Sequence, residues 1–182
     1  MRSVGRIHLL TGEIQSGKTS LCLEVIEIAR KAGIRLGGVI SPGVFVSGEK
    51  TAIDLLDTRS GECRRLADGP GGRSSAISTK RWAFLPDTIT WGNQVLKKAV
   101  PCELLMIDEL GPLEFHRGEG LVTGFKTVGS GDYRAALLVI RPSLLDEALS
   151  RWNATKIINL DDLDEPLRSG KELYESLLMQ SP

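Results

Sequence analysis

The feature that most constrains the fold of this chain is a phosphate-binding loop at Gly12 to Thr19, which matches the pattern G-x-x-x-x-G-K-[ST] at every fixed position. The apolar segment 6–11 before the loop predicts a buried strand, and the segment 20–30 after it has the periodicity of an amphipathic helix. Glycine at the first and sixth positions lets successive N–H groups converge on a phosphate chain at the positive end of that helix. A strand, this loop and a helix in this order predict nucleotide binding rather than an ordinary glycine-rich turn.

The side chains of this loop have separate expected roles. Lys18 is expected to reach the β- and γ-phosphates of a nucleoside triphosphate (NTP), and the Thr19 hydroxyl is expected to bind Mg²⁺. The predicted substrate is therefore an NTP, and the predicted cofactor is Mg²⁺. The residues expected to contact the nucleotide are Gly12, Glu13, Ile14, Gln15, Ser16, Gly17, Lys18, Thr19 and Ser20.

The rest of the chain alternates between strand-like and helix-like segments. This order predicts an α/β fold with a mainly parallel sheet flanked by helices, in one domain that spans residues 1–182. The region of about 44–66 departs from the alternation, because two strand-like stretches flank the turn-like segment 58–61. We expect this region to be a β-hairpin inserted into the α/β framework. A closing helix is expected at 165–179, with the acidic run 161–165 at its N-terminus.

A second group of candidate site residues follows two later strands. The apolar stretch 104–107 predicts a buried strand whose carboxyl end carries Asp108 and Glu109. We expect Asp108 to hold Mg²⁺ in its outer sphere and Glu109 to orient or deprotonate the attacking water. Arg141 follows the strand expected at 135–140 and is a candidate for neutralising γ-phosphate charge. A bond from Arg141 to helix-end carbonyls or to solvent is the alternative.

Two further ionisable residues are expected to be structural. His8 lies inside the first predicted strand, where a packed histidine is expected rather than a general base. Glu114 follows the acidic pair closely and is expected to brace that loop rather than to act in catalysis.

These segments resemble a known family, the THEP1-type nucleoside-triphosphatases. The run 106–114, M-I-D-E-L-G-P-L-E, is similar position by position to the V-I-D-E-I-G-x-M-E run of that family, and the run 37–42, G-G-V-I-S-P, looks like its Gly-Gly-Phe element and proline turn. The chain departs from the usual family residues at 13–16 and at 159–162. The resemblance implies a RecA-like P-loop fold and slow, Mg²⁺-dependent hydrolysis of NTPs to NDPs with broad base tolerance.

Composition argues against several other kinds of function. Lys plus Arg and Asp plus Glu number 23 each, so the chain carries no strong signal for binding nucleic acid. No stretch approaches the about 20 apolar residues that span a bilayer, so no membrane segment is expected. The three cysteines are widely spaced, which favours free thiols in a reducing compartment, and no signal core is evident. A cytoplasmic location is therefore expected.

The leading hypothesis is an NTP phosphohydrolase, and two alternatives stay open. A small-molecule or nucleotide kinase would use Asp108 or Glu109 to activate an acceptor hydroxyl. A non-enzymatic, nucleotide-gated module would bind NTP with negligible hydrolysis and would use the hairpin at about 44–66 as its partner surface. The sequence identifies no protein partner and does not fix the preferred base.

Overall fold

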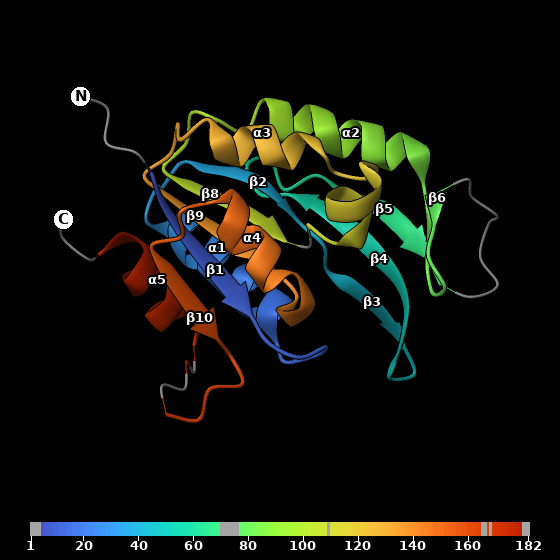
Figure 1. Cartoon of the computed structure of the whole chain (residues 1–182), viewed down its shortest axis with the longest axis horizontal. Coiled ribbons are helices and arrows are strands. Elements are labelled where there is room, and N and C mark those ends of the chain that lie inside the picture. Colours follow the sequence, from blue (N-terminus) through green and yellow to red (C-terminus); the bar gives the residue numbers. More distant parts are fainter. Residues whose placement is uncertain (1–4, 70–76, 109, 165–166, 168, 180–182) are drawn as a thin grey trace.

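Five parallel strands form the half of the sheet that carries the phosphate loop (Figure 1). The computed structural model describes residues 5–69, 77–108, 110–164, 167 and 169–179. The parallel strands lie side by side in the order β10 (Lys156–Asn159), β1 (Arg6–Thr11), β9 (Ala135–Val139), β8 (Leu104–Asp108) and β2 (Leu36–Ile40). Because these strands are parallel, their carboxyl ends meet at one edge of the sheet, and β9 separates β1 from β8.

An antiparallel extension continues the same sheet beyond β2. Its strands are β3 (Gly43–Val46), β4 (Glu49–Asp57), β5 (Cys63–Asp68), β6 (Ile77–Ser78) and β7 (Ala83–Phe84). The expected hairpin corresponds to β4 and β5, and β4 pairs directly with β2 through Leu56 opposite Ile40. The predicted α/β fold, with a parallel sheet and an inserted hairpin, is confirmed, and its antiparallel part is larger than the sequence indicated.

Helices cover both faces of the sheet. The helices α2 (Pro86–Lys97), α3 (Thr123–Gly129) and α4 (Leu145–Arg151) pack over one face, and α1 (Lys18–Lys31) and α5 (Gly170–Leu178) pack over the other (Figure 1). Each face of the sheet has its own hydrophobic core, and successive strand residues point to opposite faces. Leu9 therefore packs in the core under α2, α3 and α4, and Leu10 packs in the core under α1 and α5, both fully buried. Burying each such side chain stabilises the fold by roughly 1.5–3 kcal/mol. No helix among the described residues is both long and apolar enough to cross a membrane.

Two short helical turns follow β8 and β9. The carboxyl ends of these strands lie at the edge of the sheet that carries the phosphate loop, which we call the loop edge. A π-helix spans Leu113–Arg117 after β8, and a 3₁₀ helix spans Pro142–Leu144 after β9. Both turns therefore begin close to the residues predicted to form the site.

Two adjacent glycines allow β2 to lie close to its neighbours. A Cβ atom on Gly37 would overlap the carbonyl oxygen of Ala99, and one on Gly38 would overlap the carbonyl oxygen of Met106. Gly38 also has a φ of 107°, which side chains rarely adopt. The Gly-Gly element that resembles the THEP1 family is therefore required by the packing of β2.

The turns at the two ends of β4 lie at opposite edges of the sheet. Ser47 and Gly48 have φ values of 50° and 84° and form the β3–β4 turn. Because β4 runs antiparallel to β2, this turn lies at the same edge as the phosphate loop. The β4–β5 turn at 58–61 lies at the other edge.

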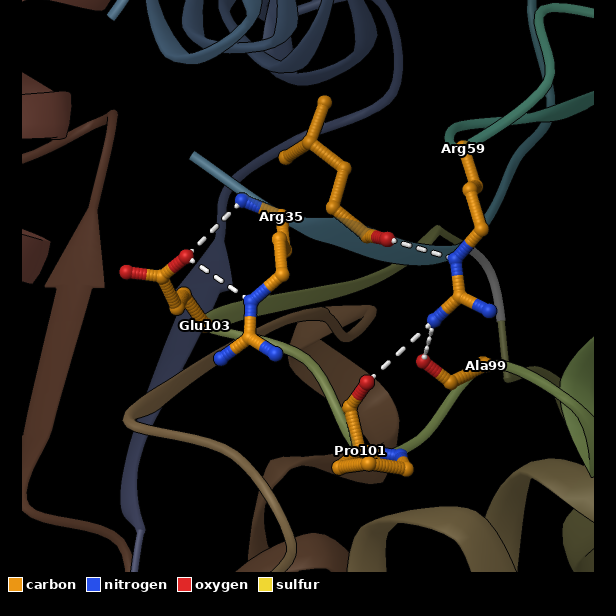
Figure 2. A network of polar contacts seen from close by, with 6 residues as sticks. Arg35, Arg59, Ala99, Pro101 and Glu103 are labelled. Carbon is orange, nitrogen blue, oxygen red and sulfur yellow. Dashed lines mark hydrogen bonds and ion pairs between the residues drawn. The ribbon is translucent and has the colours of Figure 1, made fainter. Parts of the chain in front are cut away.

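Arg59, in the β4–β5 turn, fastens the hairpin to the parallel half of the sheet. Its guanidinium donates to four carbonyl groups, which lie at the start of β2 and in the segment after α2. Figure 2 shows three of these hydrogen bonds. The acceptors are the carbonyl oxygens of Leu36 at 3.0 Å, Lys98 at 2.8 Å, Ala99 at 2.6 Å and Pro101 at 3.4 Å. One planar side chain thus joins three segments that are distant in sequence.

The closing helix begins later than expected. Helix α5 starts at Gly170, and the Ser169 side chain caps it by accepting a hydrogen bond from Glu172 N at 3.3 Å. This Ser-x-x-Glu pattern, rather than the acidic run at 161–165, marks the start of the helix. Residues 161–164 lie before the helix, so the prediction that they form its N-terminus is wrong, and Glu165 lies outside the described residues. Asp161 has a different partner, described below.

Candidate active site

The phosphate loop connects the carboxyl end of β1 to the first turn of α1. Gly12 and Gly17 have φ values of 147° and 91°, and Gln15 has a φ of 66°. A Cβ atom on Gly12 would also lie 2.8 Å from Ser16 Oγ. Helix α1 begins at Lys18, directly after Gly17. This backbone suits the binding of an anion, because N–H groups at a helix N-terminus attract negative charge.

Lys18 lies over the first half of the loop. Its Nζ donates to the carbonyl oxygens of Gly12 at 2.8 Å and Glu13 at 2.6 Å, and to Ser16 Oγ at 3.1 Å. The ammonium charge is therefore held at the loop itself. Phosphate oxygens would compete well for this group, because they carry negative charge and the carbonyl and hydroxyl oxygens do not.

Asp108 and Thr19 meet although they are 89 residues apart in sequence. The Thr19 hydroxyl donates to Asp108 Oδ2 at 2.9 Å, and the backbone N–H of Ser41 donates to the same oxygen at 3.4 Å. Asp108 is 1% exposed. The strand order explains the meeting, because β1 and β8 end at the same edge with only β9 between them. Both predicted Mg²⁺-binding residues thus converge on one point.

The side chains at this point suit a magnesium ion. Mg²⁺ prefers oxygen ligands and is usually held by one or two carboxylates together with substrate phosphates. The Thr19 hydroxyl and the buried Asp108 carboxylate both offer oxygen atoms, so they fit this preference.

The charge of Asp108 also affects the pKa of a thiol in α1. Burial raises the pKa of the Cys22 thiol well above its usual value, and the Asp108 carboxylate raises that pKa further. The positive charge of Lys18 acts in the opposite direction. Cys22 is thus a neutral, buried thiol beside the site rather than a reactive one.

The other two predicted catalytic residues are Glu109 and Arg141. Glu109 lies outside the described residues, so its role in activating water stays a prediction. Arg141 follows the last residue of β9, Val139, by two positions, and Val139 is the register partner of Asp108. Arg141 is therefore at the loop edge of the sheet, where the sequence placed it, and it is exposed. Its role also stays a prediction.

Glu114 braces the loop that follows β8, as expected. Its Oε2 accepts a hydrogen bond from Gly111 N at 2.8 Å, and its Oε1 accepts one from Leu121 N at 2.7 Å. The residue is 7% exposed. A buried carboxylate that accepts two backbone N–H groups holds both ends of this loop in place.

Asp161 makes a contact that the sequence pattern did not predict. Its Oδ2 accepts a hydrogen bond from the backbone N–H of Glu13 at 2.7 Å, inside the phosphate loop. Strand β10 pairs with β1, so the residues that follow these two strands lie side by side. Only knowledge of this strand pairing would have identified Asp161 from the sequence.

His8 is a packed residue of β1, as expected. Burial, together with the positive charges of Arg6 and Lys156, lowers the pKa of its imidazole to about 4. Neither ring nitrogen has a hydrogen-bond partner among the described residues. The ring is therefore neutral near pH 7 and lies inside the sheet rather than at its loop edge.

Known proteins share both the sequence and the fold of this chain. A family described as NTPase matches residues 7–160. The nucleoside-triphosphatase THEP1 of Ignicoccus hospitalis is 31% identical over 179 residues, which cover 95% of this chain and 97% of that protein. The THEP1 protein of Pyrobaculum islandicum is 32% identical over 100 residues, or 54% of each chain.

A solved structure supports the same relationship at the level of the fold. The solution structure of a human cancer-related nucleoside triphosphatase superposes with a TM-score of 0.62 at 20% identity, covering 88% of this chain and 91% of that one. The family match begins in β1 and ends just after β10, so it includes the phosphate loop and Asp108. This chain therefore belongs to the THEP1-type nucleoside-triphosphatase family.

Proposed function

We propose that this nucleoside-triphosphatase hydrolyses NTPs in an Mg²⁺-dependent reaction, with Thr19 and Asp108 holding the ion. The observation that carries the proposal is the 2.9 Å contact between the hydroxyl of Thr19, the last residue of the phosphate loop, and the buried Asp108 carboxylate. When bound, Mg²⁺ would draw negative charge from the phosphate oxygens.

The residues of the chain would position the substrate and its charge. The N–H groups from Gln15 to Thr19 would hold the phosphate chain, and Lys18 would move from the loop carbonyls to the β- and γ-phosphates. Glu109 would orient a water molecule, whose oxygen attacks the γ-phosphorus while the bond to the β–γ bridging oxygen breaks. The products are an NDP and inorganic phosphate. Arg141 would neutralise charge that develops on the transferred group.

Membership of the family favours water over a second substrate as the acceptor. We therefore prefer hydrolysis to the kinase reaction and to a nucleotide-gated module. We also propose that residues 1–182 act as one domain, that several bases are accepted, and that the protein works in the cytoplasm.

Phosphate release from ATP, GTP, CTP and UTP, with and without Mg²⁺, tests the proposal. The parent protein should release phosphate only with Mg²⁺, and Lys18→Ala should lower the rate by about 100-fold or more, because Lys18 contributes charge that stabilises the transition state. Lys31→Ala, at the far end of the same helix, is the matched control and should keep the parent rate.

Glu109→Gln separates binding from chemistry. This variant should bind nucleotide like the parent and turn over far more slowly. Hydrolysis at the parent rate by Lys18→Ala, or full activity in excess EDTA, would contradict the proposed mechanism.

A further inference from the structure

The segment that follows β10 lies along the first half of the phosphate loop. Leu160 N donates to the carbonyl oxygen of Thr11 at 3.0 Å, which continues the pairing of β10 with β1 into the loop. A Cβ atom on Gly12 would lie 3.3 Å from Leu160 Cβ and 3.4 Å from Asp161 Oδ2. The beginning of the loop thus rests on this segment.

The peptide groups of Glu13 are held by two charges of opposite sign. Asp161 Oδ2 accepts the Glu13 N–H at 2.7 Å, and Lys18 Nζ donates to the Glu13 carbonyl at 2.6 Å. Asp161 is in turn held by Asn159, whose Oδ1 accepts the Asp161 N–H at 3.1 Å. The neighbouring Asp162 instead accepts a hydrogen bond from Asp164 N at 2.9 Å.

When phosphates bind in the way proposed above, the contact between Asp161 and Glu13 can remain, but the contact between Lys18 and Glu13 cannot. Lys18 would then turn to the phosphates and leave the Glu13 carbonyl. Asp161 lies in the segment after β10, which is hydrogen-bonded to the end of β1. Its contact with the loop does not involve Lys18, so it does not compete with the phosphates. It would be the charged contact that still fixes this arm of the loop.

We propose that Asp161 is a positioning residue of the phosphate loop, which keeps the Glu13 peptide in place so that the downstream N–H groups stay directed at the phosphate chain. The inference rests on the proposed function of the loop. It concerns the acceptor oxygen of Asp161 rather than its negative charge, because a negative charge this close to the loop would by itself weaken phosphate binding.

Three variants separate these explanations. Asp161→Ala removes the acceptor, Asp161→Asn keeps an amide oxygen that can accept the same N–H, and Asp162→Ala removes a neighbouring carboxylate as a control. The affinity for a non-hydrolysable ATP analogue with Mg²⁺ would be measured by calorimetry. KM, kcat and the unfolding temperature would be measured on the same proteins.

Asp161→Ala should raise Kd and KM by about ten-fold, which corresponds to the upper end of the net contribution of one ordinary hydrogen bond. Asp161→Asn should restore both constants to within about two-fold of the parent, and Asp162→Ala should match the parent. Equal weakening by Asn and Ala, tighter binding by both, or a lower unfolding temperature without loss of affinity would each overturn the inference.

The binding measurement also keeps this inference distinct from the hydrolytic one. If the parent binds the analogue but releases no phosphate from NTPs, the proposed hydrolysis fails while the role of Asp161 is still decided by Kd. If the parent does not bind the analogue at all, both proposals fail.

Discussion

Acid should destabilise this protein through one buried histidine, and His8→Leu should remove that sensitivity. His8 is 1% exposed, and its pKa is about 4 in the folded chain against an ordinary value of 6.5. Between these values the unfolded chain binds a proton that the folded chain does not, so the free energy of unfolding falls as pH falls from 6.5 toward 4. The loss from His8 is about 2 kcal/mol at pH 5 and reaches about 3 kcal/mol below pH 4.

Unfolding of the parent and of His8→Leu at pH 7.5 and pH 5 measures this effect. Any repacking cost of the new side chain is common to both pH values, so the comparison uses the change between them. The parent should lose about 2 kcal/mol more than the variant, or about 4–8 °C in Tm. Equal acid losses in the parent and His8→Leu would refute the reasoning.

Two further predictions concern the contacts that hold the loops. Glu114→Gln should lower the free energy of unfolding by about 1–3 kcal/mol, because an amide can accept only one of the two backbone N–H groups that Glu114 holds. The more exposed Glu119→Gln is its control, and equal urea midpoints for the two variants would contradict the bracing role. Arg59→Ala should cost about 1–2 kcal/mol through the loss of its carbonyl contacts, whereas Lys80→Ala, at another exposed cation, should change stability by less than about 0.5 kcal/mol. Matching losses in these two variants would show that the Arg59 contacts contribute nothing.

The parts of the site that the sequence predicts are those encoded within a short stretch. The loop from Gly12 to Thr19 is encoded by residues next to one another in the sequence, and Asp108 is the last of the five consecutive buried residues that form β8. Both could be placed because a strand ends where its apolar run ends. Their contact follows once both strands are assigned to one parallel sheet.

The remaining features depend on which strands pair, and local patterns do not carry that information. Asp161 contacts the loop because β10 is the neighbour of β1, and a single sequence shows only that an acidic run follows a strand. The size of the antiparallel unit was underestimated for the same reason, since β6 and β7 have only two residues each. The start of α5 is different, because the Ser169 and Glu172 capping pair is a local pattern that lies within four residues of the sequence.

The opposite placement of the two hairpin turns has a consequence for how the chain tolerates changes in length. The turn at Ser47 and Gly48 is exposed, and its conformation depends on two residues with positive φ rather than on contacts across the sheet. The turn that contains Arg59 is bound to carbonyl groups from two other parts of the chain, so an added residue there would displace those contacts. Variation in length, whether by evolution or by insertion of a tag, is therefore expected at the first turn. That turn shares its edge of the sheet with the phosphate loop, so length can change at this edge while the opposite edge stays fixed.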